Sequence, residues 1–236
     1  PAYVKILLVL AFVLAVVLVP AGQWWAFAVH AVVLGVAIAI SRVPPLFLAR
    51  RALIEVPFLV FAVLMPFVST GPRTHAFGIS VSQAGLDAGI TLLLKGSLAV
   101  VAALLVAATT EARDLIAGFD RLHAPAPLTE IMAFMLRYVD VVAGEVRRMR
   151  IARESRGFVA SRPRHWPALG HAAGALFIRS YERGERVHLA MLSRGYAGSL
   201  PFAGQASASV RQVSLAAALP AVGWLATLVA VWMARR

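Results

Sequence analysis

The chain has 236 residues, of which 60% are hydrophobic and 14% are charged, and its formal net charge is +12. This composition excludes an ordinary soluble domain, because several apolar runs are long enough to cross a hydrocarbon core of roughly 30 Å. We attribute the basic excess to the positive-inside rule of membrane proteins and not to nucleic-acid binding. The absence of cysteine excludes disulfides, thiolate metal sites and cysteine nucleophiles.

The apolar runs predict an all-α, polytopic membrane protein with about five transmembrane helices. The first run resembles the apolar part of a signal peptide, but no convincing cleavage site follows it, so we expect a retained first helix. The expected spans, in chain order, are Val4 to Val19, Trp24 to Ile40, Ala52 to Val68, Ala88 to Thr109 and Val213 to Met233.

Basic residues set the expected orientation in the cell inner membrane. The connection from Arg42 to Arg51 is basic and should be cytoplasmic, whereas the turn at 20–23 has no basic residue and should lie outside. The N-terminus and the basic segment 111–211 then face the cytoplasm. The terminal Arg235 and Arg236 would lie outside, which opposes this orientation but weighs less than the other loops.

Three regions follow from this pattern. We expect a four-helix membrane region at 1–110, a cytoplasmic region at 111–211 and a C-terminal transmembrane helix at 212–236. Proline-containing breaks at 124–127 and 161–167 divide the cytoplasmic region into two helices of roughly 27 residues, about 40 Å long.

The second of these long helices is amphipathic. One face is cationic and the other is expected to pack. The cationic face holds Arg179, Arg183, Arg186 and Arg194, and the opposite face holds Phe177, Tyr181, His188 and Leu192. A helix lying on anionic lipid headgroups is the alternative explanation for these arginines.

Both long helices end in the same motif, Ala-x-x-Ser-Arg-Gly-aromatic. Ala152 to Phe158 matches Ala190 to Tyr196, and Arg148 corresponds to Arg186. A single copy is typical of an ordinary helix end, because glycine after the last turn accepts the left-handed conformation. Two copies indicate two equivalent binding partners, since an arginine at a helix end can reach into an acidic cleft with a bidentate fork.

The stretch from Arg179 to Tyr196, and less specifically the layout of nearly the whole chain, resembles the transmembrane T component of energy-coupling factor transporters. The CbiQ branch, which serves cobalt uptake, is the most similar. The resemblance implies that Ser155-Arg156-Gly157 and Ser193-Arg194-Gly195 end coupling helices whose arginines dock on two ATP-binding cassette (CbiO-like) subunits. The arginines implied to support these helices are Arg148, Arg179, Arg183 and Arg186.

The resemblance also implies a non-catalytic scaffold that transmits ATPase movements to a substrate-specific membrane subunit. For cobalt that subunit is CbiM-like, with or without a CbiN-like small subunit, and Phe177, Tyr181 and Leu192 face either it or the membrane helices. Nickel or vitamin import by the same kind of scaffold is the alternative, and membrane lipid is the remaining partner.

The chain lacks the residues that chemistry of its own would need. It has no phosphate-binding loop, so ATP and magnesium should be used by partner subunits, and its scattered histidines give no metal site. Two charges in apolar runs, Glu55 and Lys95, are expected to reach the nearer membrane surface separately. The other hypotheses are a stand-alone secondary carrier and a membrane enzyme using groups near Asp114, Asp120 and His123.

Overall fold

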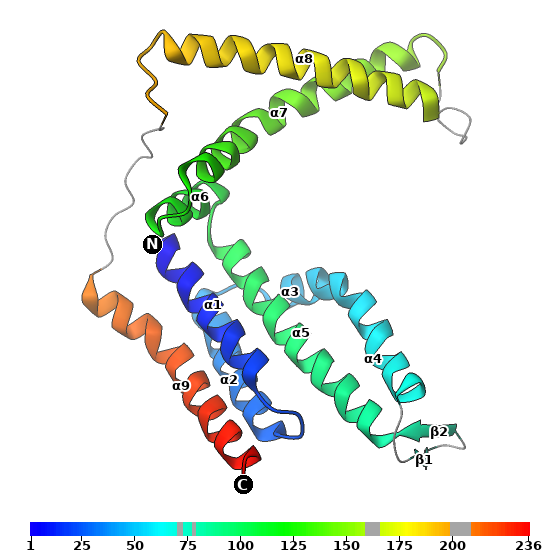
Figure 1. Ribbon diagram of the computed structural model, residues 1–236, viewed down its shortest axis with the longest axis vertical. Helices are drawn as coiled ribbons and strands as arrows, with labels where there is room; N and C mark the ends of the chain where they lie inside the picture. Colours follow the sequence, from blue (N-terminus) through cyan, green and yellow to red (C-terminus); the bar gives the residue numbers. More distant parts are fainter. Residues whose placement is uncertain (70–72, 77–78, 159–165, 199–208) are drawn as a thin grey trace. The chain divides into compact units, whose positions relative to one another are not determined.

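The structure is a computed structural model that describes residues 1–69, 73–76, 79–158, 166–198 and 209–236. Over these residues the protein is all-α, as expected, with nine α-helices, one short 3-10 turn and one small hairpin (Figure 1). It divides into two compact units, Pro1–Gly118 with Gln205–Arg236, and Phe119–Gly204. Each unit is described by itself below.

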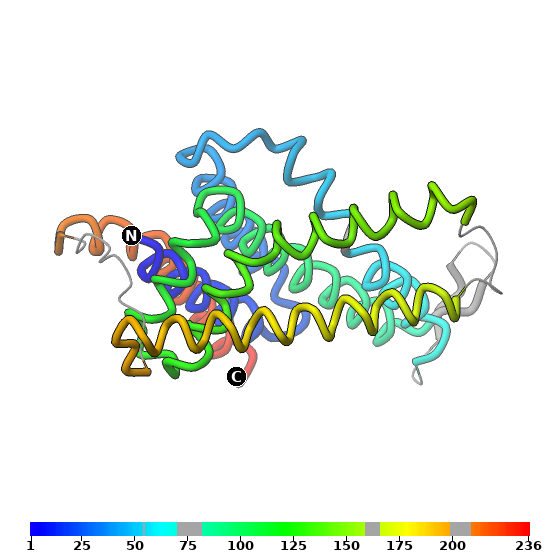
Figure 2. Tube along the Cα trace, turned by 90° about the horizontal axis from the view of Figure 1, so that it is seen from above, coloured from blue at the N-terminus to red at the C-terminus, as the bar shows by residue number. Residues whose placement is uncertain are grey.

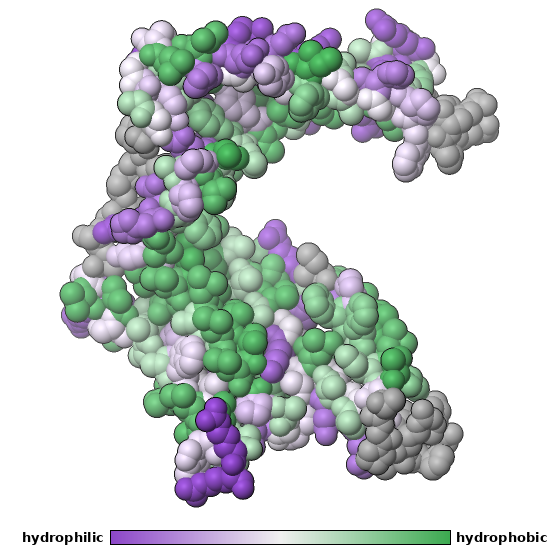
Figure 3. Space-filling view, viewed as in Figure 1, coloured by the Kyte–Doolittle hydropathy of each residue, from purple (hydrophilic) through white to green (hydrophobic). Residues whose placement is uncertain are grey.

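The first unit contains the apolar helices. Their exposed surface is largely hydrophobic on the face seen in Figure 3, as contact with lipid hydrocarbon requires. The helices are α1 (Ala2–Leu18), α2 (Trp24–Ser41), α3 (Pro45–Arg51), α4 (Val56–Val68), α5 (Gln83–Thr109) and α9 (Val210–Ala234), and α6 (Ala112–Arg121) follows α5.

Within the described ranges, α2, α5 and α9 are long and apolar enough to cross a membrane. The bent pair of α3 and α4 makes a fourth span if it is counted as one, and α1 is a shorter apolar helix of 17 residues. The protein is therefore a multi-pass membrane protein, and the number of five spans stays a prediction.

The expected third span is not one straight helix. Residues Ala52–Glu55 form a 3-10 turn between α3 and α4, and the two helices are bent by 68°. Pro57 lies in the first turn of α4, where its missing N–H leaves no helical hydrogen bond unmade, and so favours a helix start at this point. The helix predicted over Ala52 to Val68 is thus observed from Val56 onward, and its first four residues form the 3-10 turn.

Helix α5 packs closely on α4 through two glycines one turn apart. A Cβ atom on Gly85 would lie 2.6 Å from the Met65 carbonyl oxygen, and one on Gly89 would lie 2.6 Å from that of Ala62. Only glycine permits this approach, which is the small-xxx-small packing common between membrane helices. The sequence contains this signal as Gly-x-x-x-Gly, and our sequence analysis missed it.

The two charges inside apolar runs bind separate partners and not one another, and whether each reaches a membrane surface stays a prediction. Glu55 accepts a hydrogen bond of 2.8 Å from the Ser97 hydroxyl of α5. The Lys95 ammonium donates to the Val17 carbonyl oxygen at 2.7 Å, near the end of α1. The carbonyls of a last helical turn lack partners within the helix and favour a cation, so Lys95 completes the end of α1.

A fully buried polar contact joins α2 to α9 and α1. The His30 ring has 0% exposure, and its Nδ1 lies 2.8 Å from the Ala26 carbonyl oxygen. Thr227 donates to the Ala15 carbonyl oxygen at 3.0 Å, and its hydroxyl lies 3.4 Å from Nε2 of His30. Because unpaired polar groups are costly in an apolar core, these contacts fix how the three helices pack.

A short hairpin lies between α4 and α5. Strands β1 (Arg73–Ala76) and β2 (Ile79–Ser82) pair in antiparallel register. The Ser82 hydroxyl then accepts from the Gly85 N–H at 3.4 Å and caps the start of α5.

Candidate docking site

The second unit is built on two long helices, α7 (Ala126–Glu154) and α8 (Trp166–Leu192). They cross one another in Figures 1 and 2 and run in opposite directions, because the start of α7 contacts the end of α8. Pro127 lies in the first turn of α7, where a missing N–H costs nothing. Of the expected break at 161–167, residues 161–165 lie outside the described residues.

The first motif forms a Schellman-type helix end after α7. Gly157 has a φ of +74°, which favours glycine. The Phe158 N–H donates to the Arg153 carbonyl oxygen at 3.1 Å, and the Gly157 N–H donates to that of Glu154 at 3.0 Å. These bonds satisfy carbonyls that the helix itself leaves unpaired.

The second motif repeats this geometry after α8. Gly195 has a φ of +83°. The Tyr196 N–H donates to the Met191 carbonyl oxygen at 3.0 Å, and the Gly195 N–H donates to that of Leu192 at 3.0 Å. The sequence repeat is therefore also a repeat of hydrogen bonds.

The two serines have the same local function. The Ser155 hydroxyl donates to the Ala152 carbonyl oxygen at 3.1 Å, and the Ser193 hydroxyl donates to that of Ala190 at 3.0 Å. The helix end alone thus accounts for the serine and the glycine of each motif.

The two arginines have no such local role. Arg156 and Arg194 are both exposed, and neither guanidinium has a hydrogen bond or ion pair within the described residues. Each follows directly on a rigid helix end, so its starting direction is fixed while its charged fork is free. Such a side chain can bind a carboxylate with two parallel hydrogen bonds.

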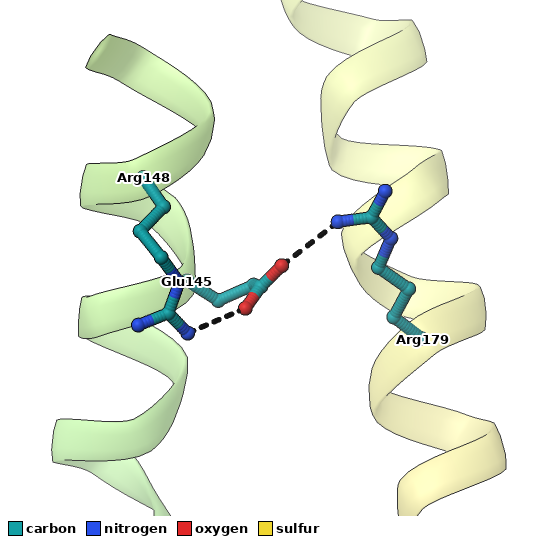
Figure 4. Close-up of polar contacts among 3 residues, drawn as sticks. All are labelled: Glu145, Arg148 and Arg179. Atoms are coloured by element: carbon teal, nitrogen blue, oxygen red, sulfur yellow. Dashed lines mark hydrogen bonds and ion pairs between the residues drawn. The ribbon is translucent and has the colours of Figure 1, made fainter. Parts of the chain in front are cut away.

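One carboxylate joins the two long helices. Glu145 of α7 accepts from Arg148 of the same helix at 2.6 Å and from Arg179 of α8 at 2.8 Å (Figure 4). Its side chain is 17% exposed, against 67% and 60% for the two arginines. The hydrogen bonds from Arg148 and then Arg179 hold the pKa of the Glu145 carboxyl below its usual range, so it is ionised at neutral pH.

A second contact joins the start of α7 to the second motif. The Tyr196 hydroxyl donates to Glu130 at 2.6 Å, and this hydrogen bond raises the pKa of Tyr196 above its ordinary value. The Tyr196 ring also meets His188 edge to face, with ring centroids 6.5 Å apart. Phe158, at the matching place in the first motif, has no hydroxyl, so the two motifs are held differently.

The helices enclose a cavity of about 370 Å³ between these two contacts. Its walls are aromatic and aliphatic, with Glu145 and its arginine at the polar edge. Among the residues that line it are Phe134, Tyr138, Glu145, Arg179, Arg183 and Tyr196.

The predicted supporting arginines therefore separate into groups. Arg148 and Arg179 share Glu145, and Arg183 lines the cavity beside them. Arg186 is exposed on α8 and does not line this cavity. Arg148 and Arg186 occupy matching positions in the two motif copies, but they do not make matching contacts.

The expected packing face of α8 is largely not packed. Phe177 is 69% exposed, Tyr181 is 60% exposed and Leu192 is 49% exposed. Arg179 instead faces α7 and pairs with Glu145, and Arg183 lines the cavity beside it. His188 alone of that face lies in the cavity.

Sequence reasoning missed Glu145 and Glu130 as contact residues. Glu145 precedes Arg148 by three positions on a helix, a spacing that favours an ion pair and is readable from the sequence. Its contact with Arg179 spans 34 residues, and no spacing rule predicts it.

These features define a class: a multi-pass membrane protein that carries two equivalent, arginine-bearing helix ends outside its apolar core. A family profile described as CbiQ, Cobalt transport protein, matches residues 1–203. The chain therefore belongs to the CbiQ/EcfT family of transmembrane components of energy-coupling factor transporters.

Curated relatives from several organisms match the chain. An uncharacterized protein of Methanocaldococcus jannaschii is 30% identical over 174 residues, which is 68% of this chain and 58% of the relative. The cobalt transport protein CbiQ of Rhodobacter capsulatus is 29% identical over 160 residues, 68% of this chain and 64% of the relative.

An energy-coupling factor transporter transmembrane protein EcfT, from Bacillus selenitireducens, is 30% identical over 172 residues, 67% of this chain and 64% of that protein. The chain thus spans between about a half and two thirds of the length of these relatives. The transmembrane components of this family are non-catalytic, and the family implies partnership with energy-coupling ATPases and a substrate-binding component.

Proposed function

We propose that this chain is the coupling scaffold of an energy-coupling factor importer. Two ATP-binding cassette subunits of the CbiO kind dock on Arg156 and Arg194, and their movements are transmitted through α7 and α8 to a substrate-binding membrane subunit. The repeated helix-end geometry carries this proposal, because it presents two arginines in the same local setting, both without an ion pair among the residues that the structure describes. ATP and magnesium are used by the partners, and this chain binds no cofactor.

The way in which α7 and α8 are joined supports transmission of movement. A docking force on one helix end reaches the other helix through Glu145 and Arg179 and through Tyr196 and Glu130. Charge-assisted hydrogen bonds of this kind are about twice as strong as neutral ones. The two helices should therefore move together.

Cobalt ion is the proposed cargo, with a CbiM-like substrate subunit in the inner membrane and the N-terminus of this chain in the cytoplasm. A CbiN-like small subunit belongs to the same proposal. The description of the family profile and the name of the Rhodobacter relative support cobalt. A putative fused cobalt transport protein CbiMQ of Methanocorpusculum labreanum, 24% identical over 128 residues, supports a CbiM-like partner. Nickel and vitamins are the alternative cargoes.

The test is charge reversal at both arginines. Arg156→Glu and Arg194→Glu are made separately and together, and cobalt uptake is measured in cells that express the whole importer. We expect each single variant to lower uptake and the double variant to abolish it. Full uptake by the double variant would mean that the motifs do not transmit the ATPase movement.

The cargo is tested separately on the purified complex. Cobalt, nickel and a vitamin mixture are each added, and the rate of ATP hydrolysis is compared with that of the unloaded complex. A higher rate of ATP hydrolysis with cobalt supports cobalt as the cargo. A higher rate with only nickel or only the vitamins would mean that the cargo is nickel or a vitamin. A stand-alone secondary carrier would instead accumulate cargo without any ATPase subunit.

A further inference from the structure

A second depression lies next to the cavity already described, on the other side of a shared wall. It has a volume of about 380 Å³ and lies within the second unit between α7 and α8. The two hollows share Phe134, Tyr138, Val187 and Met191. We call the second one the arginine pocket, and the residues that define it are Phe134, Arg137, Tyr138, Val187, Met191 and Arg194.

The charges of the two hollows differ. The first cavity contains a carboxylate, that of Glu145, which pairs with Arg179. The arginine pocket has Arg137 from α7 and Arg194 from α8, and no acidic residue lines it within the described residues. Neither arginine has an ion pair or a hydrogen bond in that part of the chain. Two cationic side chains that line one hollow both attract an anion bound there.

The walls of the arginine pocket indicate what kind of anion it takes. Phe134 and Tyr138 stack with ring centroids 6.3 Å apart, and Met191 and Val187 add apolar surface from α8. Guanidinium forks fit a planar carboxylate in a bidentate manner, and the apolar wall fits a neighbouring apolar side chain. The complementary surface is an acidic residue with an apolar or aromatic neighbour on a protein.

We propose that Arg137 and Arg194 together form one carboxylate-binding pocket, and that an acidic side chain of the ATPase subunit docked at the second motif occupies it. This rests on the proposed function and adds to it a docking residue, Arg137, which lies outside both motifs. Arg194 alone then supplies half of the second docking site. An anionic lipid headgroup is the competing occupant of the same two arginines.

The absence of cysteine makes a direct test possible, because any introduced cysteine is unique. Ala133→Cys and Ala190→Cys, which line the pocket and leave both arginines in place, are each labelled with a benzophenone maleimide in membranes that contain the ATPase subunits expressed with this chain. Arg147→Cys is the control, because Arg147 is exposed on α7 and does not line the pocket. On illumination, we expect covalent adducts with an ATPase subunit from positions 133 and 190 and none from 147.

The outcomes separate the inference from the proposed function. ATPase adducts from position 190 with only lipid adducts from position 133 overturn the composite pocket and leave the coupling function standing. The absence of ATPase adducts both from position 190 and from a label on Ala152→Cys in the first motif overturns both.

A measurement of affinity supplements the labelling. Arg137→Glu should weaken ATPase binding to the complex about tenfold, as expected for loss of one charge-assisted hydrogen-bonded contact. Arg147→Glu should change it less than about twofold. Equal effects of the two substitutions would show that only general charge matters and would overturn the pocket.

Discussion

Glu145 of α7 and Arg179 of α8 lie 2.8 Å apart across the crossing of the two long helices, with 34 residues of sequence between them. Arg148 binds the other oxygen of the same carboxylate at 2.6 Å. Arg148 therefore orients the Glu145 carboxylate from within α7, and this carboxylate in turn holds α8 through Arg179. Its loss should let α7 and α8 separate while each helix and its motif stay folded.

Removing the charge of Arg179 tests this contact. Spin labels on Val146→Cys and Ile178→Cys, both exposed positions, report the distance between α7 and α8. Arg179→Gln should broaden the distance distribution. Arg150→Gln is the matched control, because Arg150 pairs with Glu154 inside α7 at 2.7 Å, and it should leave the distribution unchanged. Equal broadening in both variants would contradict a specific contact.

The same label pair should show an acid transition. Arg148 and Arg179 lower the pKa of Glu145 in the folded chain, so the stabilisation is complete above the ordinary glutamate value of 4.5 and is lost as the pH falls through the lowered pKa. The broadening should therefore begin only below about pH 4.5. In Glu145→Gln the distribution should be broad at every pH. A midpoint between pH 5 and 7, near histidine values of about 6.5, would assign the transition to another group.

We expect the glycine of each motif to be needed because of its left-handed backbone conformation, and not because a side chain would collide with neighbouring atoms. A Cβ atom on Gly195 meets nothing within 4 Å, yet its φ is +83°. Gly195→Ala should destabilise the helix end by about 1 kcal/mol. Gly174→Ala, in open space inside α8, should instead stabilise the helix by a similar amount, about 1 kcal/mol. Amide hydrogen exchange at the end of α8 measures both, and the same sign for the two substitutions would contradict the account.

Much of the second unit could be predicted from the sequence, because helix ends are local. The positions of Gly157 and Gly195 predict the two helix ends. The positions of the arginines that precede these glycines are predicted with them. The first cavity and the arginine pocket could not be predicted, since they depend on which turn of α7 meets which turn of α8. The apolar pattern of α8 was misleading, because in a membrane complex an exposed aromatic such as Phe177 does not have to pack within its own chain.

In the membrane unit the start of α4 could be predicted only in part. Pro57 favours a helix start, but Pro66 and Pro220 lie inside α4 and α9, so a proline in an apolar run does not by itself predict a break. The Gly-x-x-x-Gly pattern of α5 predicts close helix packing, but it does not predict that α4 is the helix packed against it. The buried contact of His30 with Thr227 joins residues 197 positions apart and lies beyond any local pattern.

The close packing of α4 on α5 gives a stability prediction with an internal control. Gly89→Ala places a methyl group 2.6 Å from the Ala62 carbonyl oxygen and should destabilise the protein by about 1–3 kcal/mol. Gly96→Ala on the same helix meets nothing within 4 Å and should be neutral or stabilising. Thermal unfolding in detergent compares them, and an unchanged melting temperature for Gly89→Ala would place α4 away from α5.

The two motifs should differ in how much support they need. Tyr196 is tied to Glu130, whereas Phe158 has no hydroxyl for such a bond. Tyr196→Phe should therefore weaken ATPase binding at the second motif, and Arg194 should tolerate loss of its neighbours less well than Arg156. Alanine scanning of both helices against ATPase affinity measures this, and equal sensitivity of α7 and α8 would contradict it.

The most direct test of the whole account is the composition of the purified complex. Native mass spectrometry counts the ATPase subunits bound to the wild-type chain, to the Arg156→Glu/Arg194→Glu double variant and to an Arg147→Glu/Arg211→Glu control at two exposed arginines outside both motifs. We predict two subunits on the wild type and on the control, and none on the double variant. Two ATPase subunits retained by the double variant would contradict docking through the arginine ends.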